Sequence, residues 1–292
     1  MENSYLRQVS QFGPLSAYDI WFIDFNYDPN ELKRRTFWRR TNIFDYEKQI
    51  NETFDIIKNT YHEKLLYFGI CGSYKNGTQD KNSDIDVISV VSSLIQEPLY
   101  THADAKLIEK QELKKYLEYG EPLITNFFLN SKPFYDIDNI ENMKSIKPVK
   151  KKAIPFLLTK ADFYIDSIKI IKLVAKKYDK MIESINKLNL TISTKGCANI
   201  RDFYLKAALE RMHSSSVSLA EALHIKENEI VVDLQELYEY IAKKDEYIAK
   251  TMKEIRNRRK QCSARIKNIT IPEFEEFLNK TELNNKKLKS MI

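Results

Sequence analysis

Two short apolar runs, separated by a polar loop, constrain the fold of this chain more than any other sequence feature. The first runs from Leu65 to Ile70, and the second, rich in β-branched residues, runs from Ile85 to Val91. Runs of this length and composition predict buried β-strands. The segment from Cys71 to Ser83 contains two glycines and two asparagines. The sequence therefore predicts a strand, a loop and a second strand.

Polar residues stand where this loop meets the two predicted strands. Asp84 and Asp86 open the second strand, and residues two apart in a strand point to the same face. Two close carboxylates repel each other unless a cation lies between them, and Mg²⁺ prefers such oxygen ligands together with substrate phosphates. Gly72 lets a phosphate approach the backbone, and Ser73 offers a hydroxyl and an N–H to phosphate oxygens. These residues predict a magnesium and phosphate site.

A third carboxylate is expected from a neighbouring strand. Leu99 to Ile108 alternates well enough to predict one strand, with His102, Asp104 and Lys106 on one face. We expect Asp104 to help bind the metal and to take the proton from an attacking hydroxyl. Asp136 and Asp138 are the alternatives for this role. Two metal ions about 4 Å apart would then contact the attacking and leaving oxygens.

The remaining pattern predicts an α/β (α+β) core with a small mixed sheet, followed by an α-helical bundle. A helix is expected from near Asp45, capped by Asp45 or Asn42, and a second from Gln111 to Tyr119, ended by Gly120. A third short helix begins at Pro122, and Lys132 to Tyr135 predicts a last strand. The first helix has an apolar face formed by Ile50, Phe54, Ile57 and Tyr61.

Long helices are predicted after a linker rich in lysine, at Lys147 and Lys150 to Lys152. Three apolar stripes at helical spacing, ending near Ile185, Leu223 and Ile255, predict three amphipathic helices in a bundle. The expected organisation is an N-terminal arm (1–45), a catalytic domain (46–145), a helical bundle domain (153–268) and a C-terminal tail (269–292).

The loop and its flanking strands resemble the nucleotidyltransferase superfamily of the DNA polymerase β type. The shared pattern is a hydrophobic strand, Gly72-Ser73, a spacer, and Asp84-x-Asp86 in a second hydrophobic strand, including Ser83 before the first Asp. The segment from Asp104 to Tyr135 resembles the prokaryotic minimal nucleotidyltransferase subgroup, which has toxin–antitoxin members. The shared features there are a strand with an Asp, a helix, the turn Gly120-Glu121-Pro122 and a strand ending in Phe134-Tyr135. The resemblance covers about residues 46–141.

This resemblance implies two Mg²⁺ ions, with Mn²⁺ as a substitute, bound by Asp84, Asp86 and Asp104. It also implies a nucleoside triphosphate donor, ATP among others, contacted by Gly72, Ser73, Lys75 and Ser83. The subgroup usually carries Ala-Arg-Gly after Gly-Ser-x, whereas this chain has Lys75-Asn76-Gly77, so Lys75 is expected in place of an arginine. The Gly-Ser-Tyr-x-x-Gly-Thr form is also similar to oligoadenylate and cyclic-dinucleotide synthases, which are usually longer.

The acceptor is predicted from basic residues. Lys33 to Arg40 mixes basic and aromatic side chains, and Arg256, Arg258, Arg259, Lys260 and Arg265 form a second basic cluster. Both also have plain interpretations as a docked surface arm and a solvated helix face. We expect RNA, such as a tRNA 3′ end, or a protein side chain as the acceptor. The alternatives are a small-molecule, antibiotic-type adenylyltransferase and a catalytically decayed module that binds nucleic acid or protein.

Other features narrow the class of protein. Cys71, Cys197 and Cys262 are few and widely spaced, which predicts reduced thiols rather than a disulfide framework or a zinc site. No signal peptide or membrane-spanning run is apparent, so we expect a cytoplasmic protein. The net charge of +6 permits a nucleic acid or nucleotide partner. The short spacing of Arg211 and His213 argues against a ribonuclease site. The donor base and the oligomeric state stay open.

Overall fold

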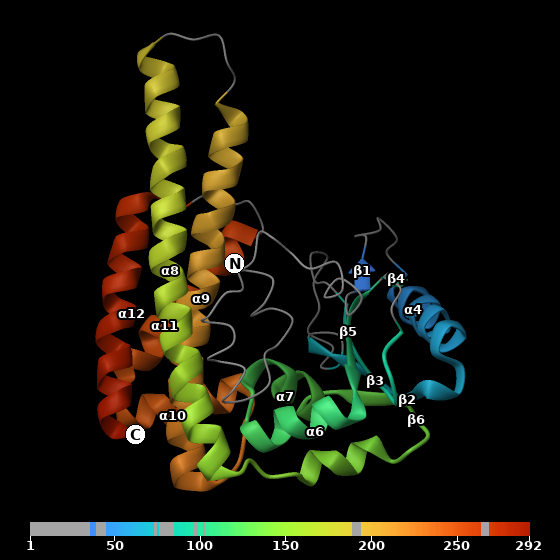
Figure 1. The fold of residues 1–292 in the computed structure, drawn as a ribbon. Helices are drawn as coiled ribbons and strands as arrows, with labels where there is room; N and C mark the ends of the chain where they lie inside the picture. The colour runs from blue at the N-terminus through green and yellow to red at the C-terminus, as the bar shows by residue number, and fades with distance from the viewer. Residues whose placement is uncertain are drawn as a thin grey trace. The chain divides into compact units, whose positions relative to one another are not determined.

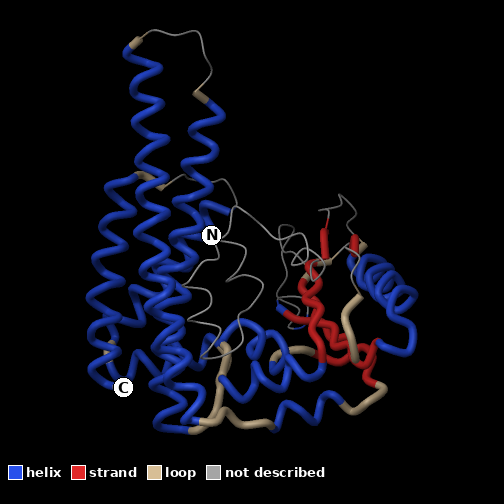
Figure 2. Tube along the Cα trace, in the orientation of Figure 1, coloured by secondary structure: helices blue, strands red, loops and turns tan. Residues whose placement is uncertain are grey.

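The computed structural model describes residues 36–38, 45–72, 75, 85–95, 99–101, 103–188, 194–263 and 269–292. These residues divide into two compact units at the boundary between Ala153 and Ile154 (Figures 1 and 2). The first unit contains strands and helices, and the regular structure of the second unit is entirely helical among its described residues. The predicted fold class, an α/β core with a small mixed sheet followed by a helical region, is confirmed.

The core of the first unit is a four-stranded sheet with the order β5-β3-β2-β6. Strand β2 (Leu65–Cys71) pairs antiparallel with β3 (Asp86–Val91) and with β6 (Lys132–Asp136). Strand β3 pairs parallel with β5 (Asp104–Glu109), so the sheet is mixed. The predicted strands at Leu65 to Ile70, Ile85 to Val91 and Lys132 to Tyr135 are therefore confirmed to within a residue or two.

The prediction of one strand from Leu99 to Ile108 is wrong. Strand β4 (Leu99–Thr101) pairs parallel with β1 (Thr36–Trp38) in a separate two-stranded sheet, whereas β5 joins the main sheet. The chain turns between the two strands, where the Thr101 hydroxyl donates to the carbonyl of Ala103 at 2.8 Å. Threonine can offer such a local bond in competition with a continuous strand.

Helices cover both faces of the main sheet. Helix α4 (Tyr46–Tyr61), which the short η1 (His62–Lys64) follows, forms one apolar cluster with alternate strand residues such as Val87. Helices α6 (Lys110–Tyr119) and α7 (Pro122–Leu129), with η2 (Ile140–Ser145), pack on the other face around residues such as Ile88.

The predicted helix ends of the first unit are confirmed by their capping contacts. The Asp45 side chain accepts from the backbone N–H of Lys48 at 3.0 Å, so it caps α4 as expected. Gly120 ends α6 in the left-handed conformation at φ 59°. The predicted apolar face of α4 is present, with Ile57 and Tyr61 buried.

The second unit contains five helices in its described residues. They are α8 (Lys150–Lys187), α9 (Lys195–Asn228), α10 (Leu234–Lys244), α11 (Glu246–Ser263) and α12 (Ile271–Met291). None of the helices in the described ranges is both long enough and apolar enough to cross a membrane.

Three details of this helical unit differ from the prediction. The lysines at 150–152, expected in a linker, form the first turn of α8. The third predicted helix is two helices, because Asp245 adopts an extended conformation and caps α11 by accepting from the N–H of Ile248 at 3.2 Å. Residues 269–292 are not a tail: Phe274 and Leu288 are fully buried, and Asn285 of α12 accepts a bond from Ser216 of α9.

Candidate active site

The strand register brings three positions from distant parts of the chain into one row across the sheet. Asp86 at the start of β3 is opposite Cys71 of β2 and opposite Asp104 of β5. Adjacent strands lie about 4.8 Å apart, so positions 86 and 104 are immediate neighbours. Two predicted metal-binding positions therefore adjoin each other. Ser73, Ser83, Asp84 and the Asp104 side chain lie outside the residues that the structure describes.

Gly72 lies against the carboxylate of Asp86. Its φ of +66° is in the left-handed region, where L side chains are strained. A Cβ atom on Gly72 would lie 2.8 Å from Oδ2 of Asp86, which is closer than such atoms approach. Glycine at this position thus lets the Asp86 carboxylate lie close against the backbone, at the place where the metal and phosphate groups are expected.

Residues next to Asp86 and Asp104 include two, Cys71 and Lys106, that the motif did not predict. Cys71 is buried, and its Sγ donates to the backbone carbonyl of Phe127 in α7 at 3.3 Å. Burial, and then the charge of Asp86, raise the pKa of the Cys71 thiol, so it is a packing residue and a poor nucleophile. Lys106, two residues after Asp104, places its Nζ 5.5 Å from the ring centre of Phe127. Lys75 is exposed.

Neither alternative third carboxylate reaches this row. Asp136 caps η2 by accepting from the N–H groups of Ile140 and Glu141, at 2.8 and 3.1 Å. It is opposite Tyr67, four residues along β2 from Cys71, which corresponds to about 13 Å of strand. Asp138 pairs with Lys110 at 2.5 Å. Asp136 and Asp138 therefore serve structural contacts, Asp136 with the start of η2 and Asp138 with Lys110.

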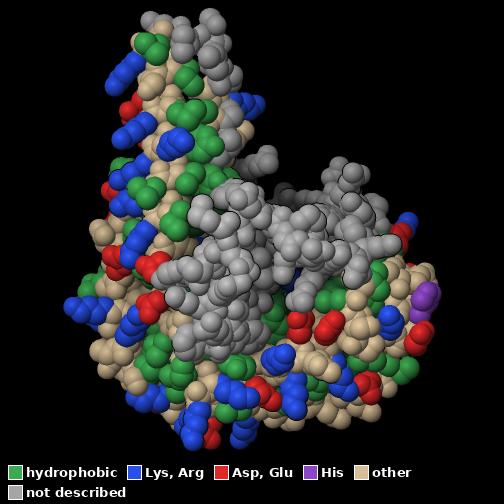
Figure 3. Space-filling view, viewed as in Figure 1, with side chains coloured by type: hydrophobic (Ala, Val, Ile, Leu, Met, Phe, Trp, Pro, Cys, Tyr) green, Lys and Arg blue, Asp and Glu red, His purple; other side chains and the backbone are tan. Residues whose placement is uncertain are grey.

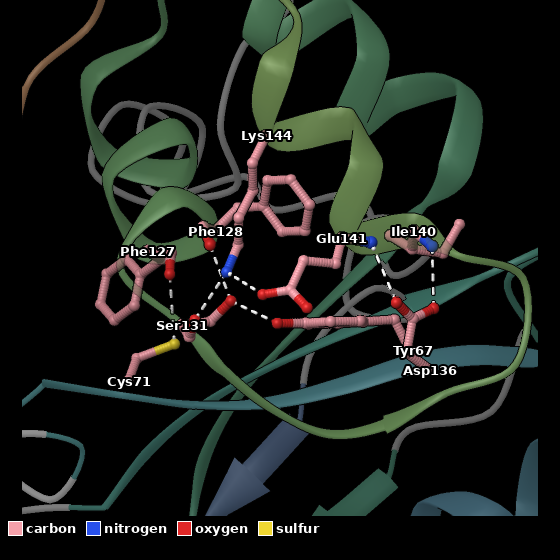
Figure 4. A network of polar contacts seen from close by, with 9 residues as sticks. All are labelled: Tyr67, Cys71, Phe127, Phe128, Ser131, Asp136, Ile140, Glu141 and Lys144. Carbon is pink, nitrogen blue, oxygen red and sulfur yellow. Dashed lines mark hydrogen bonds and ion pairs between the residues drawn. The ribbon is translucent and has the colours of Figure 1, made fainter.

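A polar network holds β2 in place on the α7 face of the sheet (Figure 4). Ser131 donates its hydroxyl to the carbonyl of Phe128 at 2.7 Å, so the Tyr67 hydroxyl, 2.5 Å away, donates to Ser131. Lys144 donates to the Ser131 carbonyl at 2.7 Å and to Glu141 at 3.0 Å. Burial raises the pKa of Tyr67 to about 12, so its hydroxyl stays protonated and can donate the hydrogen bond to Ser131. The sequence did not predict this network, because Tyr67 and Ser131 lie 64 residues apart in the chain.

No group of three or more His, Cys, Asp or Glu side chains capable of holding a metal ion occurs among the described residues. Asp86 is among these described residues, whereas Asp84 and the side chain of Asp104 are not. The carboxylate donors predicted here are nevertheless the type that Mg²⁺ prefers.

Within the basic cluster late in α11, two arginines are held in ion pairs, contrary to the prediction of a solvated face, whereas Lys260 is exposed. Arg258 is only 6% exposed and donates to both carboxylate oxygens of Glu273, while Arg259 pairs with Glu210. Arg265 lies outside the described residues. These pairs bind α11 to its neighbours, so two of the expected RNA-contacting arginines serve the packing of the helical unit instead.

Comparisons with known proteins add little to this geometry. No protein-family model and no curated protein matches the sequence. One similar solved structure is that of a nucleotidyltransferase-like protein from Exiguobacterium sibiricum 255-15, with 8% identity over 82% of this chain and 78% of that chain. The TM-score is 0.29. At that TM-score the likeness determines neither the fold nor the chemistry of this chain.

Proposed function

We propose that this chain is a metal-dependent nucleotidyltransferase. The observation that carries the proposal is the register of Asp86 with Asp104, together with the close approach of Gly72 to the Asp86 carboxylate. In the sequence, the same Gly72 precedes Ser73 and a loop that returns at Asp84-x-Asp86. Two carboxylate positions side by side, with glycine next to one of them, would suit a divalent ion, which would neutralise charge on substrate phosphates.

Each site residue has a role in this proposal. Asp84, Asp86 and Asp104 would hold two Mg²⁺ ions, which would neutralise charge on the triphosphate and on the attacking oxygen. Mn²⁺ is the substitute ion. The N–H and hydroxyl of Ser73, with Ser83 and Lys75, contact the phosphate oxygens, and Gly72 leaves room for them. The residues therefore position the reactants, as is general for this type of transfer.

The reaction is written as NTP plus acceptor hydroxyl giving acceptor–NMP plus pyrophosphate. Asp104 takes the hydroxyl proton, and the acceptor oxygen forms a bond to the α-phosphorus. The bond from the α-phosphorus to the bridging oxygen breaks, and that oxygen leaves with its electron pair as part of pyrophosphate. Atoms and charge balance without a further reactant.

The acceptor we favour is RNA, such as a tRNA 3′ end, or a protein side chain, in a cytoplasmic toxin–antitoxin setting. With Arg258 and Arg259 paired to carboxylates, the RNA hypothesis depends on the basic segment at 33–40 and on the rest of the second basic cluster. A small-molecule, antibiotic-type adenylyltransferase is the alternative enzyme. A decayed module that binds nucleic acid or protein is the alternative without catalysis.

A labelling experiment tests the proposal. The full chain is incubated with each α-³²P-labelled NTP, Mg²⁺ or Mn²⁺, and total RNA, cell lysate or a panel of small hydroxyl compounds. Asp86→Asn should abolish label transfer. Asp138→Asn is the matched control, because Asp138 is an exposed carboxylate of the same unit paired with Lys110. Transfer that survives Asp86→Asn, or wild-type protein that neither transfers label nor binds any NTP, refutes the enzyme.

A further inference from the structure

The far part of the α8–α9 hairpin lacks the packing that the rest of the helical unit has. We define the distal hairpin as residues 177–188 and 195–204. Ala175 is the last buried residue of α8, and every residue from 177 to 188 is exposed or half-buried. On α9, Leu205 is the first buried residue whose side chain is described. Helices in proteins owe most of their stability to a buried apolar face, which this segment lacks.

Helix α12 stops short of the distal hairpin. Lys172 and Lys176 of α8 both pair with Glu275, in the second turn of α12, at 3.0 and 2.8 Å. The start of α12 therefore lies at the level of Lys176. In Figure 1, α8 and α9 continue beyond the end of α12. Among the described residues, no third helix covers the distal hairpin.

The two helices of the distal hairpin contact each other along one face only. The rings of Tyr178 and Tyr204 stack with their centres 6.4 Å apart, and Arg201 pairs with Asp179 at 2.8 Å. These contacts hold α8 against α9. They leave the other face of α8 open.

That open face of α8 carries an apolar stripe. Ile170, Leu173, Met181 and Leu188 are 64%, 70%, 42% and 69% exposed. At about 100° per residue, Ile170, Met181 and Leu188 fall within roughly 20° of one another, over about 27 Å of helix. Hydrophobic side chains interspersed with Lys and Arg are visible along this part of the molecule in Figure 3. Aligned exposed apolar residues mark an interaction surface more often than scattered ones do.

Positive charge flanks the stripe. Lys177, Lys180 and Lys187 project from the same half of α8 at about 100° per residue. Their ammonium groups form no ion pair or hydrogen bond within the part of the chain that the structure describes. Lys177 falls within the stripe itself, between Leu173 and Met181. The surface therefore alternates apolar side chains with lysines that form no ion pair among the described residues, and Glu183 is the exposed carboxylate nearest to them along this stretch of α8.

We propose that the apolar stripe of α8, which runs from Ile170 into the distal hairpin, docks an acidic amphipathic helix from a partner protein, and that this helix packs there as a third helix. Apolar residues of that helix cover Ile170, Met181 and Leu188, and its carboxylates pair with Lys177, Lys180 and Lys187. A second copy of this chain would set one lysine-flanked stripe against another. A lipid surface would bury Lys177 and Ser184 within the stripe, whereas a partner helix can place a polar group opposite each.

The test uses the full chain and two synthetic helical probes of about 20 residues. Both carry leucine at the stripe spacing. One is flanked by glutamate, and the other by lysine. Fluorescence anisotropy should show the acidic probe binding about tenfold or more tightly than the basic one. Met181→Ser with Leu188→Ser should weaken the acidic probe, and both positions are exposed enough to keep the fold, as circular dichroism would verify.

Charge reversal supplies the second variant. Lys177→Glu, Lys180→Glu and Lys187→Glu together should invert the preference, so that the basic probe binds more tightly. The matched control changes Lys243, Lys250 and Lys286, exposed lysines of α10, α11 and α12, to Glu and should leave the acidic probe bound. Equal affinity for both probes, or equal loss in the control, overturns the proposal. The proposal is also overturned if neither probe binds and the wild type, but not the stripe variant, binds phosphatidylserine vesicles. Self-association of the chain in sedimentation that depends on the stripe, again with neither probe bound, has the same meaning.

Discussion

Replacing Gly72 by Ala tests the geometry of the candidate site most directly. Two effects are expected, and they can be separated. The first is backbone strain, because φ at Gly72 is +66° and an L residue in this region costs about 1–2 kcal/mol. The second is a local collision, because the added Cβ would lie 2.8 Å from Oδ2 of Asp86.

The size of the second effect follows from the contact distance. An ordinary van der Waals contact for a Cβ begins at 3.4 Å, so the carboxylate has to move by about 0.6 Å. A displacement of 1 Å at a reacting centre can cost about a hundredfold in rate, so a loss of roughly tenfold or more is expected. Affinity for Mn²⁺ should fall with it, because Asp86 is the proposed ligand that moves.

Gly120→Ala is the matched control for this variant. Gly120 has a similar φ of +59° but lies at the end of α6, and its replacement carries the same backbone strain. Chemical denaturation should show both variants about 1–2 kcal/mol less stable than wild type. Label transfer and Mn²⁺ binding, measured by paramagnetic resonance, should fall in Gly72→Ala alone.

Two results would refute this reasoning. The first is a Gly72→Ala protein that is as unstable as expected and yet binds Mn²⁺ with wild-type affinity, which would show that Asp86 is not a ligand. The second is an equal loss of label transfer in Gly120→Ala, which would show that the loss reflects stability rather than the site.

Three further predictions concern buried groups. Burial lowers the pKa of His213 from 6.5 to about 3, and the positive charges of Arg259 and Arg256 lower it further. Between these two pH values the unfolded chain therefore binds a proton at His213 that the native state does not bind. Stability should fall as pH drops from 6.5 towards 3, by up to about 1.4 kcal/mol per pH unit, and denaturation of His213→Gln should lack that slope. Burial raises the pKa of Glu221, so the native state keeps a proton on this carboxyl that the unfolded chain releases above pH 4.5. The free energy of unfolding therefore decreases as pH rises above 4.5. Glu221→Gln should therefore gain stability over wild type from pH 5 to 8, and a constant difference contradicts this. The Cys71 thiol should react with a disulfide reagent only after unfolding, and later than Cys197, because burial raises its pKa.

Local features of the fold could be predicted from the sequence because they depend on neighbours in the chain. Asp45 caps α4 through an N–H three residues away, and Gly120 ends α6 through its own φ. The apolar runs that become β2 and β3 need only their own composition to be recognised.

Contacts between distant residues could not be predicted in the same way. The segment from Leu99 to Ile108 has one pattern, but its halves pair with different strands, β1 and β3. The arginines of α11 look like a basic surface until Glu273 and Glu210 pair with them from other helices. Residues 269–292 look like a tail until their apolar side chains meet the helical core.

By itself, the sequence determined the spacing of Gly72, Ser73, Asp84 and Asp86 and the strands that flank them, because strand periodicity and loop composition are local properties. Only the tertiary structure decided which carboxylate lies next to Asp86. Asp104 does so because β5 pairs in register with β3, and Asp136 does not, because β6 pairs with the far side of β2. Strand order is set by the packing of helices on both faces of the sheet, and no segment of the chain encodes that packing alone.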